Sequence, residues 1–207
     1  MVPRARDIWR FWLDEVIERP ECIEDRSNLW FSATPAQDAE IRRLFEADVK
    51  RAGAGQLDAW KKTAQGHLVL IVLLDQFPRN IYRGRPEAFE FDEQALRLCL
   101  VGLDRKIDQT LTLVEQVFFY MPLQHAEDAV AQRLSVEKSE QHLKETPAVM
   151  QKFVQDNYKY AIQHQRIIDR FGRFPHRNPI LGRTPTAEER DYLAKGGSTF
   201  GQAKRKR

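Results

Sequence analysis

Three segments of the chain share one pattern, in which an aromatic residue or a short apolar run meets a proline and then a group of polar and ionisable side chains. They span residues 77–83 (FPRNIYR), 120–128 (YMPLQHAED) and 174–183 (FPHRNPILGR). A proline ends or redirects a helix and leaves backbone carbonyls without partners. The arginine, asparagine and histidine side chains beside it either bond to those carbonyls or line a site for a ligand, and the sequence leaves both interpretations open. Because 77–83 and 174–183 share a Phe-Pro-basic-Asn pattern, we expect them to meet.

The charges near the third segment favour an anion as the ligand. Between residues 166 and 183 the chain carries five arginines and one acidic residue, Asp169. The planar fork of an arginine suits carboxylate and phosphate oxygens, and helix N-termini near Pro86, Pro122 and Pro185 could add backbone donors. We therefore predict a basic cleft for a small phosphate- or carboxylate-bearing molecule or a peptide end. The predicted ligand-binding residues are Arg79, Asn80, Arg83, Gln124, Glu127, His164, Arg173, Arg177 and Asn178.

Asp75 is the carboxylate that most needs a partner or a function, because it directly follows the unbroken apolar run 68–74. A charged carboxylate at the edge of a core costs several kcal/mol unless it is paired. It would also lie near the C-terminal end of a helix, where the helix dipole disfavours negative charge. Asp75 therefore either forms an ion pair, with Arg79 or Arg173, or acts as a catalytic acid or base.

Two histidines, His125 and His176, join Asp75 as candidate catalytic residues. His125 and Glu127 could orient one another as a general acid–base pair, although side chains this close on a helix diverge. His164 lies on the apolar face of a predicted long helix and fits either a hydrogen-bonded core histidine or a base. In an enzyme the arginines would stabilise negative charge that develops during the reaction.

Several chemistries have no motif in this sequence. It contains no G-x-x-x-x-G-K-[ST] loop, no G-x-G-x-x-G turn, no H-E-x-x-H and no G-x-S-x-G. Its five histidines do not show tight metal-ligand spacing, so we predict no metal site and leave the cofactor unassigned.

The elements that must position these residues are predicted to be helices. Apolar residues recur at intervals of three and four, and no segment alternates as a strand does. The run from 67 to 76 is apolar all round, but a lone strand could not satisfy its hydrogen bonds, so it is predicted to be a helix that Pro78 ends. We expect an all-α fold of about eight helices, near residues 8–20, 34–50, 67–77, 92–102, 110–122, 122–142, 147–171 and 185–196.

Length and charge bound the remaining possibilities. The 207 residues suit one domain, which we place at 1–200, followed by a basic and disordered tail at 201–207. The formal net charge of +3 includes the four basic residues 204–207, so the rest of the chain carries about −1. This balance disfavours nucleic acid as a partner. No apolar run approaches the roughly 20 residues of a membrane span, and two distant cysteines, Cys22 and Cys99, suit a reducing, cytoplasmic location.

Four ordered motifs resemble those of the bacterial domain-of-unknown-function family 924. They are LLDQFPRNIYRG (73–84), FFYMPLQHAED (118–128), RFGRFPHRN (170–178) and LGRTPTAEE (181–189), together with Trp30-Phe31. The resemblance implies a bacterial, single-domain, tetratricopeptide-repeat-like superhelix, and it carries no established activity. Ala126 stands where the family pattern suggests serine, and Thr184-Pro185-Thr186 replaces a serine-threonine-proline order, so neither hydroxyl is assigned a role.

Three functions therefore remain open. The first is the binding of a small anion in the basic cleft. The second is a hydrolase or transferase in the same cleft, with Asp75, His125 or His176 as acid or base. The third is a protein-interaction scaffold in which the three segments only hold helices together. The oligomeric state is not predicted.

Overall fold

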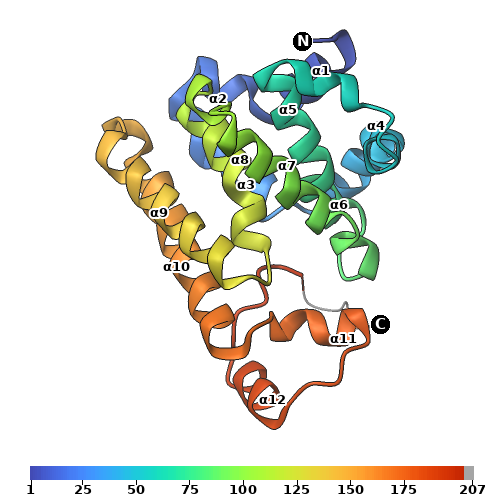
Figure 1. Ribbon diagram of the computed structural model, residues 1–207, viewed down its shortest axis with the longest axis vertical. Coiled ribbons are helices and arrows are strands. Elements are labelled where there is room, and N and C mark those ends of the chain that lie inside the picture. The colour runs from blue at the N-terminus through green and yellow to red at the C-terminus, as the bar shows by residue number, and fades with distance from the viewer. Residues whose placement is uncertain (203–207) are drawn as a thin grey trace.

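The computed structural model of the protein describes residues 1–202, and these residues form helices and connecting turns with no β-strand (Figure 1). The predicted all-α, single-domain class is confirmed. The helices exceed the eight predicted because π segments divide two long ones and short helices form after several prolines. The proposed tail falls mostly outside the described residues, at 203–207. Its first two residues are described, and Gln202 is buried against the carbonyl of Arg79.

The N-terminal quarter of the chain forms one side of the molecule. Helix α1 (Pro3–Trp9), a π segment (Arg10–Asp14) and α2 (Glu15–Glu18) follow one another without a break, and α3 (Ile23–Phe31) and α4 (Pro35–Gly53) complete it. Thr34 caps α4 in a capping box with Gln37. The buried indole of Trp12 packs edge-on against Phe77 of the central helix.

A buried helix forms the centre of the fold. It consists of α5 (Ala64–Ile71), a π segment (Val72–Gln76) and α6 (Phe77–Ile81), and every residue from 66 to 82 is buried. The prediction of a helix here is confirmed, but the predicted stop at Pro78 is wrong. Pro78 lies in the first turn of α6, directly after the π segment, where its missing N–H costs little.

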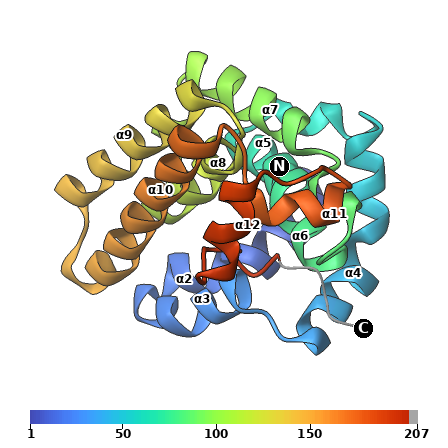
Figure 2. The same cartoon turned by 90° about the horizontal axis from the view of Figure 1, so that it is seen from below.

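Four more helices follow along the chain, of which the first two pack against this centre and the other two pack against the second of them. They are α7 (Asp92–Asp104), α8 (Leu113–His125), α9 (Ala129–Glu145) and α10 (Gln151–Phe171). Pro122 lies inside α8, one turn before its end, so it does not start a new helix as the predicted range 122–142 implies. Helices α9 and α10 run side by side as an antiparallel pair (Figures 1 and 2).

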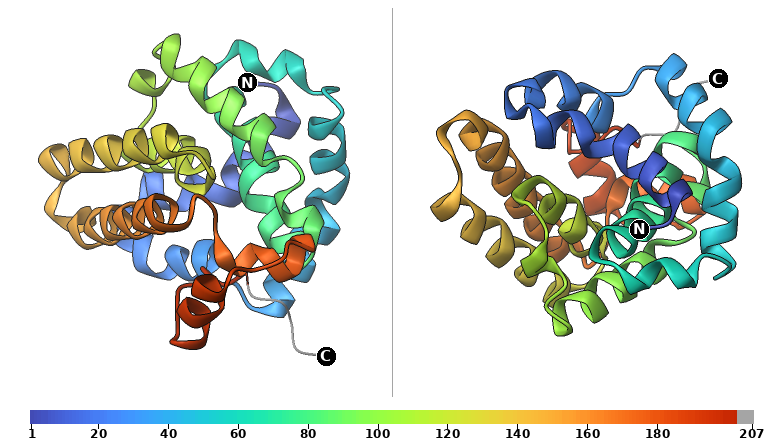
Figure 3. Two further views of the ribbon diagram at one scale, coloured as in Figure 1. Left: turned by 60° about the horizontal axis from the view of Figure 1, so that its bottom comes forward. Right: turned by 90° about the horizontal axis from the view of Figure 1, so that it is seen from above.

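The chain ends in an arm that folds back toward the centre. Gly172 closes α10 in the left-handed conformation, and the arm continues through α11 (Asn178–Leu181) and α12 (Ala187–Ala194). Its last described residues return between the N-terminal helices and the α9–α10 pair (Figure 3). A small apolar cluster around Ile168 and Phe174 lies beneath the arm, separate from the main core. None of the helices in residues 1–202 combines the length and hydropathy of a membrane span.

Candidate functional site

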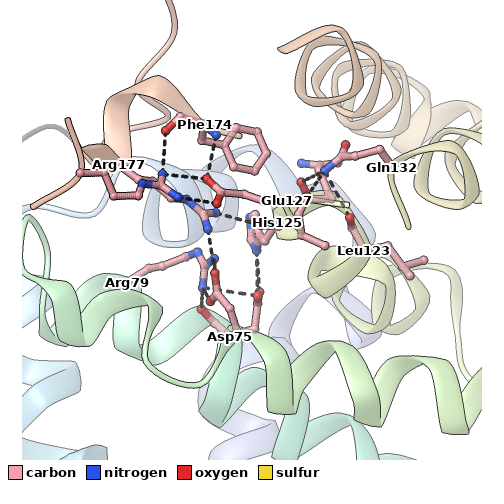
Figure 4. Close-up of polar contacts among 12 residues, drawn as sticks. Asp75, Arg79, Leu123, His125, Glu127, Gln132, Phe174 and Arg177 are labelled. Atoms are coloured by element: carbon pink, nitrogen blue, oxygen red, sulfur yellow. Dashed lines mark hydrogen bonds and ion pairs between the residues drawn. The ribbon is translucent and has the colours of Figure 1, made fainter. Parts of the chain in front are cut away.

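The two Phe-Pro segments meet, as expected, through a carboxylate that the sequence analysis did not select. Arg79 donates to both oxygens of Asp92 at 2.8 and 2.9 Å, and Arg177 donates to the same carboxylate at 3.0 Å. Arg177 also donates to the backbone carbonyl of His125 at 2.9 Å. Asp92 is the first residue of α7 and joins the central helix to the C-terminal arm. Figure 4 shows Arg79 beside Asp75 and Arg177 above them, near His125.

Asp75 is fully buried in the π segment and contacts three polar side chains. Its carboxylate accepts from His125 Nδ1 at 2.8 Å, lies 3.4 Å from Arg79 Nη1 and accepts from Gln76 Nε2 at 2.5 Å. Arg79 is thus the ion-pair partner, and Arg173 is not. Burial alone would raise the pKa of Asp75, but the charge of Arg79 and the hydrogen bonds from His125 and Gln76 outweigh it and hold the pKa below its ordinary value. Asp75 is therefore an ionised acceptor at neutral pH.

The contact with Asp75 determines which ring nitrogen of His125 carries the proton. A carboxylate only accepts hydrogen bonds, so Nδ1 carries the proton and Nε2 is left with a lone pair. Burial and then the charge of Arg79 lower the pKa of His125, so the imidazole is neutral at pH 7. The predicted His125–Glu127 pair does not form. The chain leaves the helix at Ala126, and Glu127 turns to Arg183, at 2.6 and 2.9 Å, and to the N–H of Phe174.

His125 lies in the wall of a cavity of about 550 Å³. The cavity is enclosed by α3, α6, the end of α8, the inner face of α10 and the returning segment 200–202. Six of the predicted site residues line it: Arg79, Asn80, Arg83, Gln124, His125 and His164. The sequence analysis missed its aromatic walls and Gln76. The missed aromatic residues are Trp30, Phe31, Phe153, Tyr160 and Phe200.

The remaining predicted residues lie outside the cavity lining. Asp75 is behind His125, and Arg173 is at the edge of the arm, where it donates to both oxygens of Glu189 at 2.6 and 2.8 Å. This contact lowers the pKa of Glu189 to about 2. His176 is buried beside Phe174, and burial lowers its pKa to about 3. Glu127 and Arg177 hold the arm in place through their ion pairs, and Asn178 is buried within the arm. None of these three residues lines the cavity.

Most of the arginine surplus between residues 166 and 183 is compensated by carboxylates that lie outside this range. Arg170 pairs with Glu188, Arg173 with Glu189, Arg177 with Asp92 and Arg183 with Glu127. On the cavity wall, Arg83 donates to both oxygens of Asp38 at 2.8 and 3.0 Å. The local charge count at 166–183 could not reveal these partners, because all but two of them lie far away in the sequence.

The fold and this cavity define an all-helical, single-domain protein with a histidine–carboxylate pair at the wall of a polar and aromatic pocket. A family model described as "Bacterial protein of unknown function (DUF924)" matches residues 8–197, and the chain belongs to this family. A solved structure of a protein of unknown function, ATU0120 from Agrobacterium tumefaciens, is similar over 93% of this chain and 97% of its own, with 34% identity and a TM-score of 0.75. A search of curated proteins found no match.

Proposed function

We propose that the cavity is an active site in which His125 acts as a general base, held in place by Asp75. The observation that carries this proposal is the 2.8 Å contact between the buried Asp75 carboxylate and Nδ1 of a histidine whose ring lines the cavity. Such a carboxylate fixes the ring's tautomer and stabilises the imidazolium that forms when Nε2 takes a proton. The reaction class is hydrolysis or group transfer, with the proton taken from water or from a substrate hydroxyl.

Groups next to His125 complete this assignment. Arg79 and Gln76 hold Asp75 from two further directions, so the carboxylate cannot turn away from the ring. Gln124 is buried at the cavity wall, and its side-chain amide has no partner among residues 1–202. Its N–H groups are available to negative charge that develops on a reacting oxygen. Together these residues supply a base, an orienting carboxylate and a donor.

Anion binding without catalysis is the second candidate. Arg79 and Arg83 at the cavity wall support it, but each is already paired with a carboxylate. An anion would have to share these arginines with Asp92 and Asp38, which reduces its expected affinity. A scaffold role would use the exposed apolar residues at the mouth, where Phe31 is 47% exposed.

A turnover screen with matched histidine variants tests the proposal. The purified protein is assayed against p-nitrophenyl esters, phosphates and glycosides, and against amide analogues. For any substrate that is turned over, His125→Gln should reduce kcat by at least about 100-fold, since general-base catalysis contributes roughly 10²–10⁴. His142→Gln is the control, because His142 is buried away from the cavity. Equal turnover by wild type and His125→Gln would contradict the proposal.

Two further expectations, the location of the protein and the class of its helical repeat, are also proposed. A cytoplasmic location fits Cys99, which is buried and free, and Cys22, which is also free. The tetratricopeptide-like description that the family resemblance implies is supported by the antiparallel packing of α9 and α10.

A further inference from the structure

The side-chain amides at the cavity wall have a fixed orientation. Gln76 donates from Nε2 to Asp75, and Asn80 donates from Nδ2 to Asp38 at 3.0 Å. A carboxylate accepts hydrogen bonds and cannot donate them, so each amide must present its NH₂ group to the carboxylate. The oxygens of Gln76 and Asn80 then remain as acceptors. Neither oxygen has a partner among the described residues, and neither is sealed from solvent.

Two histidines at the same wall are fixed in the same way. Nδ1 of His125 faces Asp75, and Nδ1 of His164 lies 2.8 Å from the backbone carbonyl of Tyr160. Both partners are acceptors, so both rings carry their proton on Nδ1, and Nε2 of each ring keeps a lone pair that can accept a hydrogen bond. Burial lowers the pKa of each histidine, which keeps both neutral. Gln76, Asn80, His125 and His164 thus form a set of acceptors on one cavity, and a ligand that fits it must be rich in donors.

The charged side chains of the lining are already paired. Besides Arg79 and Arg83, the lining contains Lys152 with Glu24 at 2.9 Å, and Asp156 with Lys159 at 2.9 Å. A charged ligand would have no uncompensated partner in the described lining, and desolvating it would cost several kcal/mol. The cavity therefore favours a neutral ligand.

Aromatic rings form much of the remaining wall. Phe200 stacks on His164 with ring centroids 3.7 Å apart, and Phe31 and Tyr160 are 47% and 52% exposed. The face of an aromatic ring carries partial negative charge and attracts weakly positive C–H groups. The lining residues Phe153 and His164 lie eleven positions apart on α10, which corresponds to a length of about 16 Å. The lining thus extends over this length of α10 and combines aromatic rings with the acceptors.

We infer that the cavity binds a neutral polyol, a sugar or short oligosaccharide by chemical class. Hydroxyl groups supply the donors that Gln76, Asn80, His125 and His164 require, and the C–H face of a sugar ring packs against the aromatic walls. The volume of about 550 Å³ lies within the usual range for small-molecule sites. The inference rests on the proposed active site and names its substrate class. It places a substrate hydroxyl, or a water bound beside it, at Nε2 of His125.

Ligand binding to the full-length protein tests this inference separately from turnover. Trp30 lines the cavity, so its fluorescence and the thermal midpoint are followed with neutral hexoses, pentoses, inositol and their di- and trisaccharides. Matched charged probes are glucose 6-phosphate, gluconate and glucosamine. We expect saturable binding of at least one neutral sugar, and weaker binding of its charged derivatives. No response to any neutral sugar, or tighter binding of a charged derivative, would overturn the inference.

Two variants assign the binding to this cavity. His164→Phe keeps the ring that stacks on Phe200 but removes the acceptor, and it should weaken binding by roughly tenfold, as expected for one hydrogen bond. Phe31→Ala should weaken binding by a similar factor with little loss of stability. Leu100→Ala, an exposed apolar change on α7 away from the cavity, is the control and should bind normally. Binding that survives both cavity variants would contradict the assignment.

The two proposals fail in different ways. If sugars bind and His125→Gln leaves turnover unchanged, the general-base function fails while the ligand class stands. If His125→Gln abolishes turnover of a substrate that is not a polyol, the ligand class fails while the base stands.

Discussion

At the scale of single residues, the site depends on which ring nitrogen of His125 carries the proton. Asp75 determines this, because its buried carboxylate faces Nδ1 and can only accept. The sequence predicts that Asp75 needs a cation and that His125 belongs to the site. It does not predict that the two residues meet, since they are fifty positions apart and come from different helices. Only proximity in the sequence points to Glu127 as the partner of His125.

Asp75→Asn should reverse the tautomer of His125. The side-chain amide that this change introduces can donate to Nδ1, which would move the ring proton to Nε2 and remove the base from the cavity. We expect kcat to fall by about 10⁴, as for the corresponding change in serine proteases. The ¹⁵N spectrum of the imidazole should show protonated Nε2 in the Asp75→Asn variant. An unchanged spectrum together with unchanged turnover would exclude the orienting role of Asp75.

At the scale of elements, the C-terminal arm is attached to the central helix mainly by polar contacts. Its own apolar cluster is small, and Asp92 accepts from buried arginines on both elements. The sequence predicts that the Phe-Pro segments of the central helix and of the arm meet, and this is confirmed by their shared contact with Asp92. It misplaced Arg173 in the cleft, because the partner Glu189 and the direction of the arm depend on tertiary packing.

Asp92→Asn should therefore loosen the arm. Removing the shared carboxylate charge leaves Arg79 and Arg177 partly uncompensated, and breaking a buried pair in this way costs about 3–5 kcal/mol of unfolding free energy. Urea denaturation measures the loss. Glu93→Gln is a matched control at the next position, since the Glu93 side chain is 88% exposed and pairs with Arg97 on the surface of the same helix. A surface pair of this kind contributes at most about 1 kcal/mol. Similar losses in the two variants would contradict the bridging role of Asp92.

At the scale of the whole molecule, the fold keeps its five histidines neutral. Burial lowers the pKa of His142 to about 4 and that of His176 to about 3, and it also lowers the pKa of His67, His125 and His164. Composition gives the number of histidines but not their burial. The fold class followed from periodicity alone, whereas the cavity walls did not, because helices α3 and α10 are distant in sequence and their contact is set by packing.

Acid should destabilise the protein in a range set by these histidines. The unfolded chain binds a proton on each near pH 6.5, whereas folded His142 and His176 bind one only near pH 4 and 3. The unfolded state therefore carries more protons between these limits, and the free energy of unfolding should fall as the pH drops from 7 to 5. The expected loss is roughly 2 kcal/mol for each of the two. Urea unfolding at both pH values measures this loss. In the His142→Gln variant the loss should be smaller by the contribution of His142. A stability that is constant or rises toward pH 5 would contradict this prediction.

The most direct test of the proposed site is the ¹⁵N resonance of His125 Nε2, recorded against pH with and without a neutral sugar that binds. We predict an unprotonated Nε2 at pH 7, a pKa below the ordinary histidine value and a shift of this resonance when the sugar is added. A protonated Nε2 at pH 7, or a bound sugar that leaves the resonance unchanged, would contradict both the general base and the acceptor-lined cavity.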